Sequence, residues 1–125
     1  MNRTRTVEAA AMTALTPHDA MAAWGAAVDA RSAARASWKA AERAYDVNNV
    51  EERERTARAA DDAGDVYNAT RRLPSAARRA VCDAYTQAGF PQAFRVLRTI
   101  APGALGWTPD LEAVLAALLE APTHT

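Results

Sequence analysis

Small residues recur at alternating steps of three and four positions along the first third of the chain, which is the spacing of one face of a helix. We name this set the alanine ladder: Ala20, Ala23, Ala27, Ala30, Ala34, Ser37, Ala41 and Ala44. No proline follows Pro17 until Pro74, and clusters of β-branched residues with alternating polarity are missing. The pattern predicts a long helix in an all-α protein.

Helix start and stop signals divide the chain further. Thr16 and Pro17 open the first helix as cap and first-turn residue, and Asn48 or Asn49 caps the second. The connection between them is so short that the two helices must form a long antiparallel αα-hairpin. Helices are predicted at about 17–46, 49–72, 74–88, 91–100 and 109–120.

The length of 125 residues predicts a single helical domain over 1–125. The ends, 1–15 and 121–125, are expected to be flexible or weakly ordered.

The last predicted helix has the clearest apolar periodicity. Its large aliphatic residues are Leu111, Val114, Leu115, Leu118 and Leu119. We expect it to pack over the base of the hairpin, although a helix that docks into a partner's groove would have the same pattern. Its expected neighbours in the core are Phe90, Phe94, Leu97, Ile100 and Trp107.

A heptad row of larger side chains runs beside the alanine ladder: Trp24, Arg31, Trp38 and Tyr45. We name it the aromatic row. The second helix offers a matching stripe: Thr56, Ala60, Ala63, Tyr67 and Thr70. The two stripes can meet inside the hairpin, or part of the row can face a second subunit or a partner. Arg31 can stack on an indole or extend from a half-buried face into solvent.

The composition indicates a thin hydrophobic core. Alanine supplies 33 of the 125 residues, and an alanine buries little area at roughly 25 cal/mol per Å². Thin cores are commonly completed by oligomerisation or by a partner. Composition therefore favours association.

Charge is balanced overall and uneven locally. The net charge is zero, so no global field favours nucleic acid or a membrane. Residues 71–98 nevertheless carry one acid, Asp83, and six arginines that are candidate phosphate contacts: Arg71, Arg72, Arg78, Arg79, Arg95 and Arg98. A helix-turn-helix is disfavoured because Tyr85 and Arg95 stand where that motif needs a small and an aliphatic residue. A second basic row, Arg31, Arg35, Lys39 and Arg43, is read as a solvated helix face.

Candidate chemistry is sparse. His18 and His124 are the only histidines, and no metal-ligand spacing, phosphate-binding loop or catalytic motif occurs. Asp61 and Asp65 share a helix face, which is read as solvated. We predict a protein that is not an enzyme and that has no cofactor, no metal and no small-molecule substrate.

Cys82 is the only cysteine, so it has no intramolecular disulfide partner. No run of apolar residues is long enough to span a membrane. We expect a cytoplasmic protein that does not bind membranes.

Together these patterns predict a small helical protein that binds another protein, or itself, through the Ala-rich hairpin and the aromatic row. An adaptor, an inhibitor or an assembly protein fits the profile. The alternative is a nucleic-acid-binding accessory or regulatory protein that uses Arg71 to Arg98.

Overall fold

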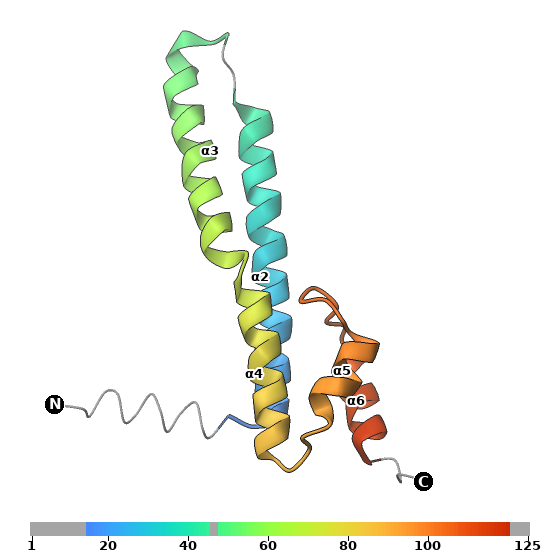
Figure 1. Ribbon diagram of the computed structural model, residues 1–125. Helices are drawn as coiled ribbons and strands as arrows, with labels where there is room; N and C mark the ends of the chain where they lie inside the picture. The colour runs from blue at the N-terminus through green and yellow to red at the C-terminus, as the bar shows by residue number, and fades with distance from the viewer. Residues whose placement is uncertain (1–14, 46–47, 121–125) are drawn as a thin grey trace, which may run out of the picture.

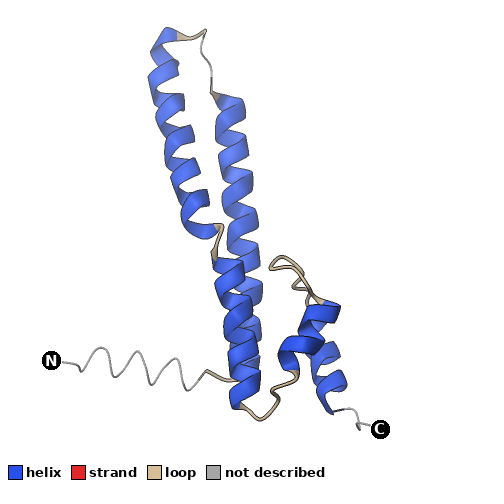
Figure 2. Cartoon of the chain, in the orientation of Figure 1, coloured by secondary structure: helices blue, strands red, loops and turns tan. Residues whose placement is uncertain are grey.

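The computed structural model describes residues 15–45 and 48–120. Every regular element in these residues is a helix, as Figure 2 shows, which confirms the predicted class. The helices are α2 (Pro17–Ala44), α3 (Val50–Thr70), α4 (Leu73–Gln87), α5 (Ala93–Ile100) and α6 (Leu111–Glu120). The predicted end of the first helix at residue 46 and both chain ends, 1–14 and 121–125, lie outside the described residues.

Helix α2 is the axis of the molecule (Figure 1). Helix α3 packs antiparallel along the half of α2 nearer the hairpin tip, and α4 packs along the other half. The predicted hairpin is therefore confirmed. Its second arm, however, continues past a bend at residues 71–72 as α4, which the sequence analysis treated as a separate short helix. The bend lies just ahead of Pro74, which has no amide hydrogen to donate to the Thr70 carbonyl and therefore interrupts the helical hydrogen bonds there.

The core lies at the base of the molecule, where α2, α4, α5 and α6 meet. Its largest fully buried side chains are Trp24, Met21, Leu97, Leu115 and Val81. The core cluster contains no residue of α3. The half of the hairpin near its tip therefore extends beyond the core as two helices alone (Figure 1).

Two side-chain caps fix where the long helices begin. The Thr16 hydroxyl accepts a hydrogen bond from the Asp19 amide at 3.0 Å, as predicted for the start of α2. The Asn49 side-chain oxygen accepts one from the Glu52 amide at 3.2 Å, so Asn49 caps α3. Such caps satisfy amide groups that have no partner within the helix.

The last two helices begin two residues after their predicted starts. Pro91 and Pro109 lie in turns that precede α5 and α6. The Thr108 hydroxyl donates to the Asp110 carboxylate at 2.7 Å instead of capping a helix. Pro91 alone, and the cap-proline-acid pattern at Thr108 to Asp110, therefore mark turns and not the first residues of the helices.

Helix α6 packs over the base of the hairpin as predicted, with one side against the core. The side turned away from the core carries Val114 and Leu118, which remain exposed. Phe94 was expected in the core and is 52% exposed, so that expectation was wrong. The buried residues of α6 are Leu111, Leu115 and Leu119.

Candidate functional site

The aromatic row runs from the core to the surface. Trp24 is 0% exposed, and its Nε1 donates to the Ala104 carbonyl at 2.8 Å. Arg31 is half-buried, and its Nη2 donates to the Tyr67 hydroxyl at 3.1 Å. Its guanidinium carbon lies 5.5 Å from the centre of the Tyr67 ring. Trp24 and Arg31 therefore make these hydrogen bonds to groups within the chain.

Trp38 also faces α3. Its indole stacks on Tyr67, and Gly64 provides the space beside it, because an added Cβ there would lie 3.2 Å from the indole nitrogen. Tyr45, the last member of the row, is 40% exposed. It lines a cleft of about 410 Å³ near the hairpin tip, together with Glu42, Ala57, Ala60 and Asp61. Of the aromatic row, Tyr45 is the member most open to solvent.

The alanine ladder divides into two sets. Its members Ala20 and Ala34 are buried and Ala27 and Ala41 are half-buried, whereas every second member is exposed. The exposed members alternate with three further alanines of α2, and together they form a second series with steps of three and four residues. We name this series the small seam: Ala23, Ala26, Ala30, Ala33, Ser37, Ala40 and Ala44, all exposed. Sequence periodicity missed it because alanine occurs on several faces of α2.

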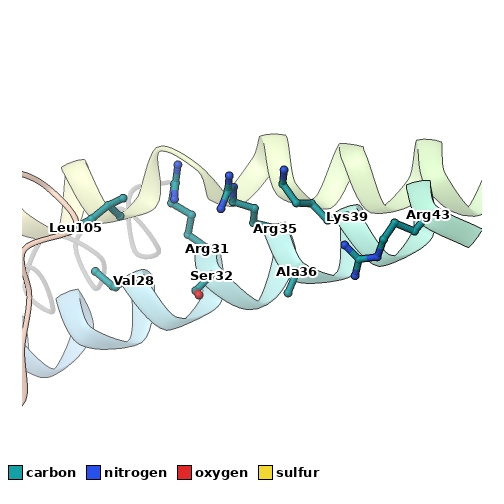
Figure 3. Close-up of a pocket in the computed structure, with 8 residues that line it drawn as sticks. All are labelled: Val28, Arg31, Ser32, Arg35, Ala36, Lys39, Arg43 and Leu105. Carbon is teal, nitrogen blue, oxygen red and sulfur yellow. The ribbon is translucent and has the colours of Figure 1, made fainter.

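The other flank of α2 carries a basic groove, shown in Figure 3. The side chains of Arg31, Arg35 and Lys39 project side by side from successive turns, and Leu105 closes one end (Figure 3). The groove has a volume of about 530 Å³ and is lined by Val28, Arg31, Ser32, Arg35, Ala36, Lys39, Arg43 and Leu105. The basic row that the sequence analysis read as a solvated face thus forms one wall of a concave surface.

The basic groove and the small seam lie on opposite flanks of α2. Lys39 follows Ala30 by nine residues, and Arg35 follows Ala26 by nine. Nine residues make about two and a half helical turns, so each pair points in opposite directions. A variant in one surface therefore leaves the other unaltered.

The six arginines of residues 71–98 are spread over the fold. Arg71 and Arg72 are exposed at the bend, and Arg95 and Arg98 are exposed on α5. Arg78 and Arg79 line one concave surface together. We name it the Phe94 cleft, with a volume of about 410 Å³ and a lining of Ser75, Arg78, Arg79, Cys82, Asp83, Phe94, Pro102 and Ala104.

Among the described residues, the pKa values of three side chains are shifted, and each shift has a local cause. Burial raises the pKa of the Cys82 thiol, so the group is held as the neutral, less reactive form. Burial also raises the pKa of Tyr85. A hydrogen bond to Glu112 raises the pKa of the exposed His18. Glu112 is the shared neighbour of His18 and Tyr85, since its charge also raises the pKa of Tyr85. Residues 15–45 and 48–120 hold no cluster of three metal-ligating side chains.

Within the described residues, none of the helices has the length and apolarity needed to cross a lipid bilayer. Comparison of the chain with protein-family models, with curated protein sequences and with solved structures returned no match.

Proposed function

We propose that this is a non-enzymatic, cytoplasmic binding protein that docks its α2–α3 hairpin onto another protein, in the first place onto a second copy of itself. The observation that carries the proposal is that α3, a helix of 21 residues, contains no buried residue. Most helical stability in proteins comes from packing an apolar face against a tertiary neighbour. A hairpin half without a core is expected to gain that packing from a partner.

The small seam is the surface that suits a second helix pair. Its steps of three and four match the seam of a coiled coil, and its side chains are no larger than serine. Small side chains let helix axes approach to about 8 Å, the lower end of ordinary helix packing. Two hairpins related by a two-fold axis would then form a four-helix arrangement with an isologous interface.

Helix α3 offers an apolar contribution to the same face. Ala57 lies in the cleft with Tyr45 and Glu42, which places it on one face of the hairpin. Val66 follows Ala57 by nine residues and therefore lies on the opposite flank of α3. Glu42 also lines a pocket with Lys39 and Arg43, so Ala57 is on the flank of the basic groove. Val66 is exposed, and its opposite position on α3 puts it on the flank of the small seam.

The test is the molar mass in solution, measured by size-exclusion chromatography with light scattering over a concentration series. We expect a dimer for the unaltered protein and a monomer for the double variant Ala30→Glu, Ser37→Glu, which places two carboxylates in the seam. The matched control is Ser32→Glu, Ala36→Glu, which changes the same residue types on the opposite flank of α2 and should remain dimeric.

Amide hydrogen exchange completes the test. If the unaltered protein stays monomeric up to about 1 mM, an association of about −4 kcal/mol is excluded. The hairpin amides then decide between the remaining cases. Amides of α3 that exchange as slowly as those of α4 would show a self-sufficient hairpin and contradict the proposal. Fast exchange in α3 would direct the search to a different protein, by crosslinking in the native host.

A further inference from the structure

The basic groove and the Phe94 cleft adjoin across one loop. Ala104 lines the cleft, and its neighbour Leu105 lines the groove. The loop is held in place at both sites, because Trp24 donates to the Ala104 carbonyl and Arg78 Nε donates to the Ala101 carbonyl at 3.1 Å. The two concavities therefore share this loop, and we name the two together the basic surface: the groove along α2 and the cleft beside α4.

This surface is strongly cationic. Its cations are Arg31, Arg35, Lys39 and Arg43 in the groove, and Arg78 and Arg79 in the cleft. One acid, Asp83, lines it. The ion pairs found among the described residues involve Arg55, Arg58 and His18, and none involves these six cations. Toward the hairpin tip, Glu42 lines a small pocket with Lys39 and Arg43 but forms no ion pair with either, and Asp61 lines the neighbouring cleft. Arg31 and Arg78 already donate to Tyr67 and to the Ala101 carbonyl. Among the described residues no such partner is found for the other four cations, Arg35, Lys39, Arg43 and Arg79, which are therefore available to an anionic ligand.

The spacing of the groove cations suits a chain of charges. They stand four residues apart on one helix, which corresponds to a rise of about 6 Å per step and about 18 Å in all. A ligand that matches this row carries a negative charge at each repeat along an extended chain. Arginine is well suited to phosphate, because its planar fork donates two parallel hydrogen bonds.

The exposed ring of Phe94 distinguishes between two kinds of polyanionic ligand, a single-stranded nucleic acid and an acidic protein segment. Phe94 is half exposed and lies in the cleft with Arg78 and Arg79. A flat ring beside cations is the arrangement on which proteins stack the bases of single strands while basic side chains follow the backbone. An acidic protein segment has no group that requires such a ring.

We propose that this surface binds single-stranded nucleic acid without sequence preference, with phosphates along the basic groove and a base stacked on Phe94. This activity goes beyond the protein binding proposed for the hairpin and uses the opposite flank of α2. It also differs from the earlier expectation for residues 71–98, of which only Arg78 and Arg79 take part.

The first test measures the affinity for a fluorescent oligothymidylate by anisotropy over a salt series. The strand has about 20 nucleotides, which is longer than the about 16 that a single OB-fold covers at most. We expect binding that weakens as salt rises. The double variant Arg35→Glu, Lys39→Glu should bind at least about 10-fold more weakly, and the slope of log affinity against log salt should fall by about 1.4, the value for two lost phosphate contacts on a single strand.

The control is the double variant Arg55→Glu, Arg58→Glu. It changes the net charge by the same amount, at two exposed arginines of α3 that already pair with Glu52 and Glu54. We expect it to keep the affinity of the unaltered protein within about two-fold, since contacts outside the groove contribute little to the salt-dependent term. Equal losses in both double variants would indicate a non-specific charge effect and overturn the proposal.

The second test separates the base from the phosphate. Phe94→Ala should weaken oligothymidylate binding about 5-fold or more, within the range measured for one stacked base. Phe94→Tyr should restore it, and binding of an inorganic polyphosphate chain should not change in either variant. If Phe94→Ala binds oligothymidylate as the unaltered protein does, the base is not stacked there and the proposal fails.

Three further outcomes would overturn the proposal. The first is the absence of oligothymidylate binding at the lowest salt, and the second is unaltered binding in the Arg35→Glu, Lys39→Glu variant. In the third, polyglutamate binds as tightly as oligothymidylate, which would assign the surface to an acidic protein segment. The groove variant should keep the solution mass of the unaltered protein, since the small seam lies on the other flank. A failure here is thereby distinguishable from a failure of the proposed self-association.

Discussion

The indole of Trp38 stacks on the phenol ring of Tyr67, with ring centroids 5.3 Å apart and planes 13° from parallel. Arg31, about two turns earlier on α2, contacts the hydroxyl and the ring of the same tyrosine. Most other residues that α3 turns toward α2 are small, such as Ala60 and Ala63. The closure of the hairpin beyond the core therefore depends mainly on this one aromatic contact.

Trp38→Ala should loosen the hairpin and leave the core intact. An aromatic pair is worth about 0.5–1.5 kcal/mol beyond its buried area, and no core layer lies near to compensate. We expect amides of α3 to exchange faster by about 10-fold or more, while those around Val81 in α4 are unchanged. The control is Tyr45→Ala, which removes an exposed aromatic side chain of the same row. It should alter neither the exchange of the α3 amides nor that of the α4 amides. Unchanged exchange of the α3 amides in Trp38→Ala would show that the stack contributes nothing to the closure of the hairpin.

The same substitution on the two sides of α6 should lower the free energy of unfolding by very different amounts. Leu115 is 0% exposed and Leu118 is 47% exposed. Leu115→Ala removes a core side chain and should lower the free energy of unfolding by about 2–5 kcal/mol. Leu118→Ala should change it by less than about 1 kcal/mol, in the range typical of surface positions. Urea unfolding followed by circular dichroism measures both. Similar losses would indicate that Leu118 is covered in solution.

The helices were predictable because their signals are local. The apolar spacing and the caps at Thr16 and Asn49 depend only on residues within a few positions of each other. The bent second arm was not predictable, since the packing of α4 along α2 depends on contacts such as those of Val81 in the core cluster. Sequence spacing identified Pro74 as a break and left open where the chain went next.

The candidate surfaces were harder to predict, for two physical reasons. Alanine fits a buried face and an exposed face equally well, so the ladder did not reveal which face of α2 packs against the rest of the chain. The positions of Trp24 and Trp38 identify that face. The basic groove needs Leu105 beside Arg31, and only the folded loop brings them together. No local pattern encodes that approach.

Gly25 is required by the ring of Trp107. A Cβ added at this position would lie 2.5 Å from a ring carbon of that indole, closer than atoms can approach. Gly25→Ala should therefore displace Trp107 and cost about 1–3 kcal/mol, as overpacked cores do, with a shift in tryptophan fluorescence. The control is Gly103→Ala, where the added Cβ meets nothing within 4 Å. Its stability should stay within about 0.5 kcal/mol. A fully stable Gly25→Ala would contradict the close packing.

One ion pair joins the first turns of α2 and α6. His18 Nδ1 lies 2.8 Å from one carboxylate oxygen of Glu112 and 3.0 Å from the other. This hydrogen bond, with the charge of Glu112, raises the pKa of His18 above its usual 6.5. The protonated imidazole is thus favoured in the folded state. Both side chains are open to solvent, so the effect is screened by salt.

The stability that this pair contributes should fall as the pH rises. A group whose pKa is raised on folding stabilises the folded state fully below its unfolded pKa, here 6.5, and loses that effect as the pH passes the raised value. The unaltered protein should therefore melt at a higher temperature than Glu112→Gln at about pH 5.5, and at the same temperature at about pH 8.5. Glu120→Gln removes an exposed carboxylate from the same helix and is the control. A melting difference that persists at the higher pH would assign the role of Glu112 to contacts other than His18.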